Sequence, residues 1–228
     1  GKSDREIMAF CQSFMTELYK YIGADVDVPA GDIGTGAREI GYLFGQYRKL
    51  RGAYENGVLT GKARSFGGSL IRPEATGFGA VYYLESVMKH EHDTLEGKTV
   101  AVAGFGNVAW GVVQKLSELG AKPVTLSGPD GYIYDPDGIT TKEKFDFMLE
   151  MRASGRNKVQ DYADKFGCKF VAGDKPWGEK VDIIMPCATQ NDVDLTQAKR
   201  IVANNIKYYI EVANMPTTNE ALRFLMDQ

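Results

Sequence analysis

The chain has 228 residues, of which 43% are hydrophobic and 25% charged, enough for one large domain or two small ones with an ordinary apolar core. Its formal net charge of −3 gives no electrostatic reason to expect nucleic acid or an anionic membrane as a partner. No run of about 18 apolar residues occurs, so we expect no membrane-spanning helix.

Three cysteines lie far apart in the sequence: Cys11, Cys168 and Cys187. Their odd number argues against a disulfide framework, and no CxxC or histidine-rich spacing suggests a metal site. We therefore expect free thiols that are buried or half-buried, no bound metal, and a reducing, cytoplasmic location.

The chain opens with a predicted helix. Ser3 and Glu6 have the spacing of a capping box at its start, and Gly23 is a plausible stop. Between them apolar side chains recur at helical spacing, which predicts one apolar face. These residues are Ile7, Phe10, Cys11, Phe14, Leu18 and Ile22.

A loop and two further helices follow. The loop DVDVPAGDIGTG leads into a helix predicted over residues 37–50. Residues 51–73 are rich in glycine and should form mostly turns and short segments. A second apolar helix is predicted over residues 75–90.

From Lys98 onward, predicted strands alternate with predicted helices. The strands are KTVAVAG, KPVTLSG, CKFVA, VDIIMPC and YYIEVAN. The helices cover NVAWGVVQKLSELG, residues 142–152, residues 158–166 and LTQAKRIVANN, while GYIYDPDGIT is expected to be a small excursion of turns. This order predicts an α/β fold with a Rossmann-like, doubly wound and mostly parallel sheet. The change of pattern near Leu95 is a candidate boundary to the helical and loop segment before it.

The strongest mechanistic motif is VAVAGFGNVAWG, in which Gly104, Gly106 and Ala109 give G-x-G-x-x-A. The first glycine permits a tight turn, the second lets the backbone approach a pyrophosphate, and the alanine lets the helix pack close to the strand. Amide groups at the start of the helix then face the anion. Because the motif follows a predicted strand and opens a predicted helix, it indicates dinucleotide binding rather than a plain connection.

The segment TLSGPDG, at the end of the second strand, bears on the choice of cofactor. Asp130 is a candidate contact to the adenosine ribose, although it comes later than the usual offset of about 20 residues and is also a turn former. No Arg or Lys stands within residues 125–131 to receive a 2′-phosphate, and Phe105 in the glycine loop is bulky and apolar. These features favour NAD over NADP.

Packing alone does not require the particular sequences of three longer segments: DVPAGDIGTGAREIGY, TGKARSFGGSLIRPEATGFG and EVANMPTTNEAL. Together with GFGNVAWG and TLSGPDGYIYDPDG they resemble the hexameric bacterial glutamate dehydrogenases, within the Glu/Leu/Phe/Val dehydrogenase family. The likeness runs essentially from end to end. The phenylalanine and proline–aspartate around the ribose site look like the NAD-linked clostridial type, whereas NADP-linked members typically carry serine-rich versions.

The resemblance implies a catalytic role for Asp32 in PAGDIG, which matches the family's catalytic aspartate. Removing the α-hydrogen as hydride requires a neutral amine, so a nearby carboxylate must accept a proton from the substrate nitrogen. Taken alone, Asp32 would be interpreted as a loop or N-cap residue. Gly31 and Thr60 match positions that contact the substrate.

The resemblance also implies a set of cofactor-binding residues: Arg72, Thr76, Gly104, Phe105, Gly106, Asn107, Val108, Asp130 and Asn214. By themselves, Arg72 suggests a surface or interdomain salt bridge and Asn107 an N-cap. Asn214 follows the last predicted strand, where strand ends line the cofactor crevice. Four glycines are candidate hinge residues for closing a cleft: Gly67, Gly68, Gly77 and Gly79.

The implied activity of the full-length protein is NAD-dependent oxidative deamination of L-glutamate to 2-oxoglutarate and ammonium, in a homohexamer. Residues 1–75 would be part of the substrate (dimerisation) domain, and residues 76–228 a C-terminally truncated NAD-binding domain. The family's GGGKGG segment with its catalytic lysine would precede Gly1, and a substrate-binding serine would follow Gln228. Both ends look cut, so we expect the 228 residues alone not to catalyse turnover.

Two alternatives remain at this point. A leucine, valine or phenylalanine dehydrogenase has an aspartate loop of the same kind. A non-catalytic dinucleotide-binding module would also explain the glycine motif, but it has no evident need for the carboxylate of Asp32.

Overall fold

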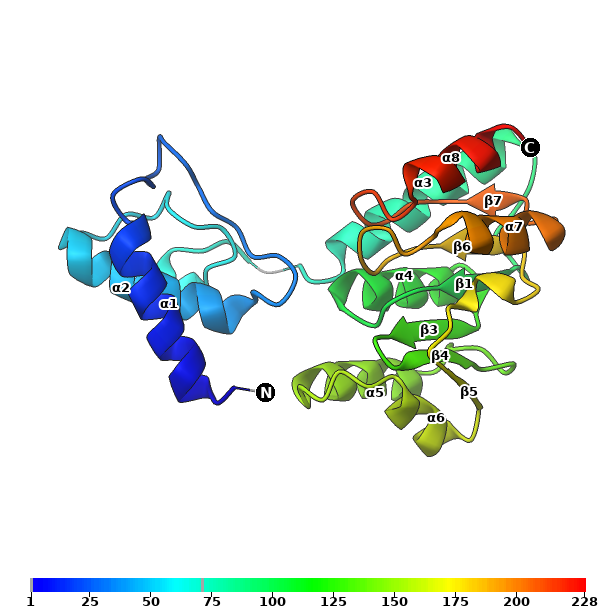
Figure 1. The fold of residues 1–228 in the computed structure, drawn as a ribbon, viewed down its shortest axis with the longest axis horizontal. Coiled ribbons are helices and arrows are strands. Elements are labelled where there is room, and N and C mark those ends of the chain that lie inside the picture. Colours follow the sequence, from blue (N-terminus) through cyan, green and yellow to red (C-terminus); the bar gives the residue numbers. More distant parts are fainter. Residues whose placement is uncertain (1, 71) are drawn as a thin grey trace. The chain divides into compact units, whose positions relative to one another are not determined.

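The computed structural model describes residues 2–70 and 72–228. The chain divides into two compact units, Gly1–Arg72 and Pro73–Gln228. The change of sequence pattern near Leu95 is therefore not a boundary between units, because the helix before it belongs to the second unit. Figure 1 shows the elements of both units in chain order. Within the described residues, no helix is both long enough and apolar enough to cross a bilayer.

Two helices form most of the first unit. α1 (Asp4–Leu18) packs on α2 (Ala37–Arg51), and a single 3-10 turn, η1 (Arg64–Phe66), follows. The capping box predicted at the start of α1 is present. The buried core of this unit includes Cys11, Met15, Ile40, Phe44, Tyr47, Val58 and Leu59.

The face of α1 that is buried differs from the predicted apolar stripe. Phe10 and Phe14 are 71% and 51% exposed, whereas Cys11 and Met15 are buried. The helix also ends at Leu18, before the glycine that the sequence suggested as a stop. Helical spacing was therefore predicted correctly, but the side of the helix that α2 covers was not.

The second unit contains a parallel sheet in the order β2-β1-β6-β7 and an antiparallel sheet in the order β3-β4-β5. The parallel strands are β1 (Thr99–Val102), β2 (Lys122–Pro123), β6 (Ile183–Met185) and β7 (Tyr208–Tyr209). The antiparallel strands are β3 (Thr125–Gly128), β4 (Gly131–Tyr134) and β5 (Lys169–Ala172).

Helices connect these strands. They are α3 (Ala75–His90), α4 (Asn107–Glu118), α5 (Lys142–Ala153), α6 (Gln160–Phe166), α7 (Leu195–Ala203) and α8 (Asn219–Met226), with a 3-10 turn, η2 (Pro176–Gly178), before β6. The helices predicted over residues 37–50, 75–90 and 142–152 are thus present, each within one residue of its expected bounds.

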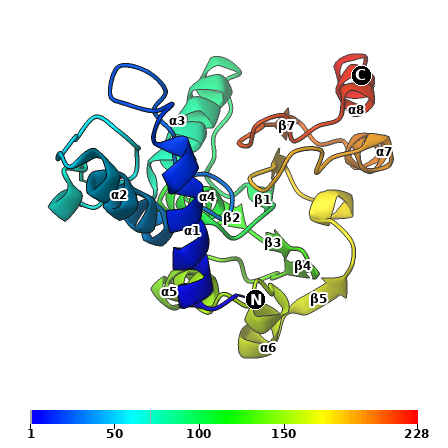
Figure 2. The ribbon, with the colours of Figure 1, turned by 60° about the vertical axis from the view of Figure 1, so that its left-hand side comes forward.

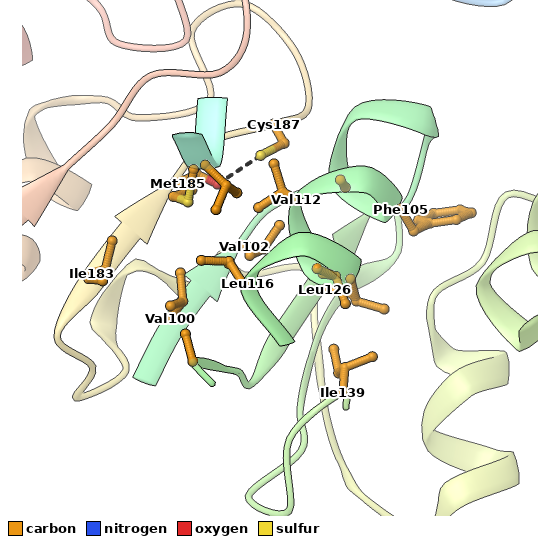
Figure 3. Close-up of a cluster of buried hydrophobic side chains, with 14 of the residues drawn as sticks. Val100, Val102, Phe105, Val112, Leu116, Leu126, Ile139, Ile183, Met185 and Cys187 are labelled. Atoms are coloured by element: carbon orange, nitrogen blue, oxygen red, sulfur yellow. Dashed lines mark hydrogen bonds between the residues drawn. The ribbon is translucent and has the colours of Figure 1, made fainter. Parts of the chain in front are cut away.

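Both faces of the parallel sheet are covered by helices, which confirms the doubly wound α/β prediction. Successive side chains of a strand point to opposite faces. Val100 and Val102 pack with Val112 and Leu116 of α4, as Figure 3 shows. Ala101 and its alternating neighbours face the other way, toward α7 and α8. In Figure 2, α3 and α4 lie on one side of β1 and β6, and α7 and α8 on the other.

Two details of the sheet differ from the sequence prediction. The segment GYIYDPDGIT is not only turns, because its first four residues form β4, paired with β3 and β5. The predicted strand KPVTLSG is interrupted at Val124, so that only its first part joins the parallel sheet. A four-residue strand between two glycine turns is hard to distinguish from a turn excursion in sequence, because one of its two partners, β5, is far along the chain.

Helices α3 and α4 approach each other through glycines. A Cβ atom on Gly77 would lie 2.4 Å from the backbone nitrogen of Val112, and one on Gly111 would lie 2.7 Å from the carbonyl oxygen of Glu74. Such distances leave no room for a side chain at either position. Gly77 therefore has a packing role inside a helix, and its part in a hinge remains a prediction.

Candidate cofactor and substrate site

The glycine loop lies where β1 ends and α4 begins. Gly104 has φ 82°, a value that favours glycine, and a Cβ there would lie 3.2 Å from the carbonyl oxygen of Cys187. The amide of Gly104 donates to Oγ of buried Ser127 at 2.9 Å. The loop is thus held against the ends of both β6 and β3.

The start of α4 is suited to bind an anion. Gly106 is the N-cap residue, and over the described part of the chain no side chain caps this helix. A Cβ on Gly106 would have nothing within 4 Å, so the space in front of it is open. Uncapped amides at a helix N-terminus, reached over a bare glycine, bind a pyrophosphate well. Asn107 is the first residue of the helix rather than its N-cap, so its alternative interpretation as a cap is wrong.

Other predicted cofactor residues lie near this edge of the sheet. Because a Cβ on Gly77 would lie 2.5 Å from the carbonyl oxygen of Val108, Thr76 is next to the first turn of α4. Beyond β7, the amide of Val212 still donates to the carbonyl of Pro186 at 3.0 Å, and Asn214 follows two residues later. The carboxyl ends of parallel strands are where ligands bind in such folds.

Phe105 and Asp130 meet at the end of β3. Phe105 is only 7% exposed, and its ring would be 3.1 Å from a Cβ on Gly128 (Figure 3). The carboxylate of Asp130 accepts the amides of Val159 and Gln160, each at 3.0 Å, and so caps the start of α6. The predicted contact of Asp130 to a ribose remains a prediction, and its structural role is the cap.

Asp32 lies in the first unit, in an exposed loop with Gly31. The amide of Thr35 donates to the carbonyl of Asp32 at 2.8 Å, which closes a turn around it. α2 is capped by Gly36 with the side chain of Glu39, so the N-cap interpretation of Asp32 is wrong. Its carboxylate has no evident part in starting the helix and is presented to solvent.

Thr60 is joined to the same loop by backbone. Its amide donates to the carbonyl of Pro29 at 2.9 Å. The structure therefore joins Thr60 to the loop that carries Gly31 and Asp32, and the roles of these three residues in substrate binding remain predictions. Arg72 is exposed at the end of this unit, whereas Thr76 and the glycine loop belong to the second.

Sequence reasoning missed the two hydroxyl residues that hold the glycine loop. Oγ1 of Thr125 accepts the amide of Val102 at 2.8 Å, and Ser127 supports Gly104 in the same way. These side chains replace the backbone ladder that β3 would otherwise make with β1. In the segment TLSG the two hydroxyl residues are two positions apart, so both side chains face β1. This spacing is the signal for their role that the sequence offers.

The cysteines are free and two of them are buried, as expected: Cys11, Cys168 and Cys187. Cys187 follows β6, and its thiol lies 3.3 Å from the carbonyl oxygen of Met185. Burial raises the pKa of this thiol, and burial raises that of Cys168 to about 11. Neither environment favours a reactive thiolate. Across residues 2–70 and 72–228, no group of three or more His, Cys, Asp or Glu is placed to hold a metal ion.

A β-strand, a glycine turn and an uncapped helix at the edge of a doubly wound sheet define the class of dinucleotide-binding α/β proteins. The family model described as Glutamate/Leucine/Phenylalanine/Valine dehydrogenase matches residues 67–228, and that of the Glu/Leu/Phe/Val dehydrogenase dimerisation domain matches residues 1–49. The chain belongs to the Glu/Leu/Phe/Val dehydrogenase family.

Similar proteins are glutamate dehydrogenases. The chain is 81% identical over its whole length to an NAD-specific glutamate dehydrogenase of Clostridium symbiosum and covers 51% of it. With an NAD-specific enzyme of Porphyromonas gingivalis the identity is 56%, over 98% of the chain and 50% of the relative. A solved structure of Plasmodium falciparum glutamate dehydrogenase has a TM-score of 0.90 at 46% identity, covering 100% of the chain and 48% of that structure. The chain thus spans about half the length of the curated relatives it matches.

Proposed function

We propose that the full-length protein is an NAD-dependent glutamate dehydrogenase, which converts L-glutamate to 2-oxoglutarate and ammonium. The observation that carries the proposal is the open, uncapped start of α4 behind Gly106, beside the apolar Phe105. Similarity to enzymes named NAD-specific glutamate dehydrogenases supports both the cofactor and the substrate.

In this proposal, some residues of the chain bind the cofactor or the substrate, and Asp32 transfers a proton. The first amides of α4 hold the pyrophosphate, with Thr76, Asn107 and Asn214 contributing to cofactor binding. Bound NAD supplies the acceptor for the hydride that leaves Cα of the amino acid. Asp32 takes a proton from the substrate nitrogen and returns it later, while Gly31 and Thr60 help to orient the substrate.

NAD is favoured over NADP by the surroundings of Gly128. The phenyl ring of Phe105 packs there, and the carboxylate of Asp130 lies close by, only 2.8 Å from where a Cβ on Gly128 would be. An apolar ring and a negative charge are unfavourable neighbours for a 2′-phosphate. No Arg or Lys occurs in residues 125–131 to offset them.

The proposed assembly is a homohexamer located in the cytoplasm. A related Thermus thermophilus glutamate dehydrogenase, 26% identical with a TM-score of 0.80, is described as hetero-hexameric. The three free thiols suit a reducing compartment. The net charge of −3 gives no reason to propose nucleic acid or membrane partners.

Substitution of Asp32 in the full-length protein tests the proposed reaction. Asp32→Asn keeps the shape of the side chain but removes the proton acceptor, so kcat for glutamate oxidation should fall by about 10²–10⁴-fold. The Kd for NAD should not change, because Asp32 belongs to the first unit. NADH formation with glutamate, leucine and phenylalanine as substrates measures the effect and the specificity together.

Three outcomes would count against the proposal. Unchanged kcat in Asp32→Asn would show that Asp32 is not the proton acceptor, whereas NAD binding without oxidation of any of the three amino acids by the unaltered protein would leave a dinucleotide-binding module as the better description. Faster oxidation of leucine or phenylalanine than of glutamate would assign the protein to another branch of the family. Asp25→Asn, a change in the same loop region that the proposal does not involve, is the matched control and should leave kcat unchanged.

A further inference from the structure

Lys62 is a buried lysine in the first unit. It is 6% exposed, and its Nζ donates to the carbonyl oxygen of Val58 at 2.8 Å and to that of Leu59. Within the described part of the chain no carboxylate forms an ion pair with it, and the ring of Phe44 lies 5.8 Å from Nζ, farther away than the two carbonyl oxygens. Lysines are rarely buried without a partner, and the desolvation lowers the pKa of this one.

The two carbonyls bound by Lys62 belong to an unusual turn. Leu59 has φ 61°, a left-handed conformation that is uncommon for a leucine, and Gly61 follows with φ 77°. Such a conformation persists only where its surroundings determine it. The hydrogen bonds from Nζ to the carbonyls of Val58 and Leu59 stabilise this backbone conformation, because both oxygens must point inward to meet the ammonium group.

The backbone after Lys62 is also fixed. A Cβ on Gly68 would lie 1.8 Å from the carbonyl oxygen of Lys62, and the amide of Gly68 donates to the carbonyl of Ala63 at 3.1 Å. The chain therefore returns over the base of the lysine. This packing fixes the backbone position from which the Lys62 side chain extends.

This turn is connected directly to the loop of Asp32. The amide of Thr60 donates to the carbonyl of Pro29, as described above. Cγ1 of Ile40 lies 3.8 Å from a Cβ built on Gly31 and 3.9 Å from one built on Gly61. The turn and the loop thus lie side by side over the same residue of α2.

We propose that Lys62 is a positioning residue for the reaction. Its ammonium group closes the turn Val58–Lys62 and thereby holds Thr60 and the loop of Asp32 in the arrangement that the substrate requires. Lys62 acts from beneath the site and does not touch the substrate. The inference rests on the proposed function, in which Asp32 transfers a proton and Thr60 helps to bind the amino acid.

Three variants of the full-length enzyme test this role. Lys62→Met keeps the apolar stem but removes the donor, Lys62→Arg keeps donors, and Lys20→Met is a control at an exposed lysine of the same unit. In Lys62→Met, kcat/KM for glutamate should fall on the order of 100-fold, because small displacements of reacting groups have effects of this size. The Kd for NAD should stay the same, and Lys62→Arg should recover part of the activity. Unchanged kcat/KM in a Lys62→Met enzyme with a lower melting temperature would overturn the proposal.

Hydrogen exchange measured by mass spectrometry gives a second test that does not depend on turnover. In Lys62→Gln, a milder change that retains an N–H donor on a shorter side chain, residues 29–35 and 58–62 should exchange faster while α1 and α2 keep their protection. Unchanged exchange in these two segments, or an equal increase across the whole unit, would overturn the positioning role.

Together, the activity and exchange measurements distinguish failure of the proposed function from failure of the positioning role of Lys62. Absence of glutamate oxidation by the unaltered enzyme would refute the proposed function, whereas the exchange pattern would still report whether Lys62 orders the loop. Glutamate oxidation that is normal in the unaltered enzyme and equally normal in Lys62→Met would refute the positioning role alone.

Discussion

At the scale of single residues, the glycine loop depends on a side chain that the sequence did not single out. Gly104 and Gly106 could be recognised because their spacing is tied to pyrophosphate binding. Ser127 could not, because a hydroxyl that replaces a backbone bond between strands becomes visible only when both strands are in place. Lys62 was missed for a related reason, since a lysine in a glycine-rich turn ordinarily faces solvent.

Substitution of Ser127 by alanine should weaken both the fold and the cofactor site. The amide of Gly104 would lose its buried partner, at a cost of about 1–3 kcal/mol. We expect a lower melting temperature and weaker binding of NAD, measured by thermal unfolding and by titration. Ser86→Ala, at an exposed hydroxyl on α3, should change neither. Normal NAD affinity in Ser127→Ala would show that the loop keeps its shape without this bond.

At the scale of elements, helices were predicted well and strands less completely. α2 has a capping box and a left-handed glycine after it, α5 starts at the cap Thr141, and α3 follows Pro73, so their bounds could be read from nearby residues. The antiparallel sheet β3-β4-β5 was not predicted, because the pairing of β4 with β5 joins segments separated by two helices. Pairing between distant segments has no local signature.

The close approach of α3 and α4 gives a prediction with a built-in control. In Gly77→Ala the new methyl group would meet the backbone of α4, so the helices must separate, with a cost of about 1–3 kcal/mol. Gly79→Ala, on the same helix, has nothing within 4 Å of the new atom and should stabilise α3 by about 0.5–1 kcal/mol. Thermal unfolding of the two variants should therefore shift in opposite directions. Equal shifts would mean that the two helices are not packed through Gly77.

At the scale of the whole molecule, the described residues leave apolar surface uncovered. A groove of about 390 Å³ in the first unit is bordered by α1, α2 and the loop of Asp32, and Phe10 and Phe14 form part of its lining. Two exposed phenylalanines on one helix face are unusual for a surface in contact with water. Such a face favours contact with a second apolar surface.

We expect the purified 228-residue chain to self-associate through this face. The double substitution of Phe10 and Phe14 by glutamine should lower the sedimentation coefficient and the binding of a hydrophobic dye. Replacement of the exposed Tyr82 and Tyr83 on α3 by glutamine is the control and should leave association unchanged. Association that persists equally in both double variants would place the contact elsewhere.

Binding of NAD at the start of α4 is the central claim, and calorimetric titration of the full-length protein with NAD and NADP tests it most directly. Gly106 has φ −75°, which alanine also adopts, and open space around it, so Gly106→Ala should not change the melting temperature. The added methyl group would, however, occupy the approach of the pyrophosphate, and we predict that NAD binding weakens at least about tenfold, or about 1.4 kcal/mol. NAD should bind more tightly than NADP to the unaltered protein. Equal NAD affinity in Gly106→Ala and the unaltered protein would contradict the account.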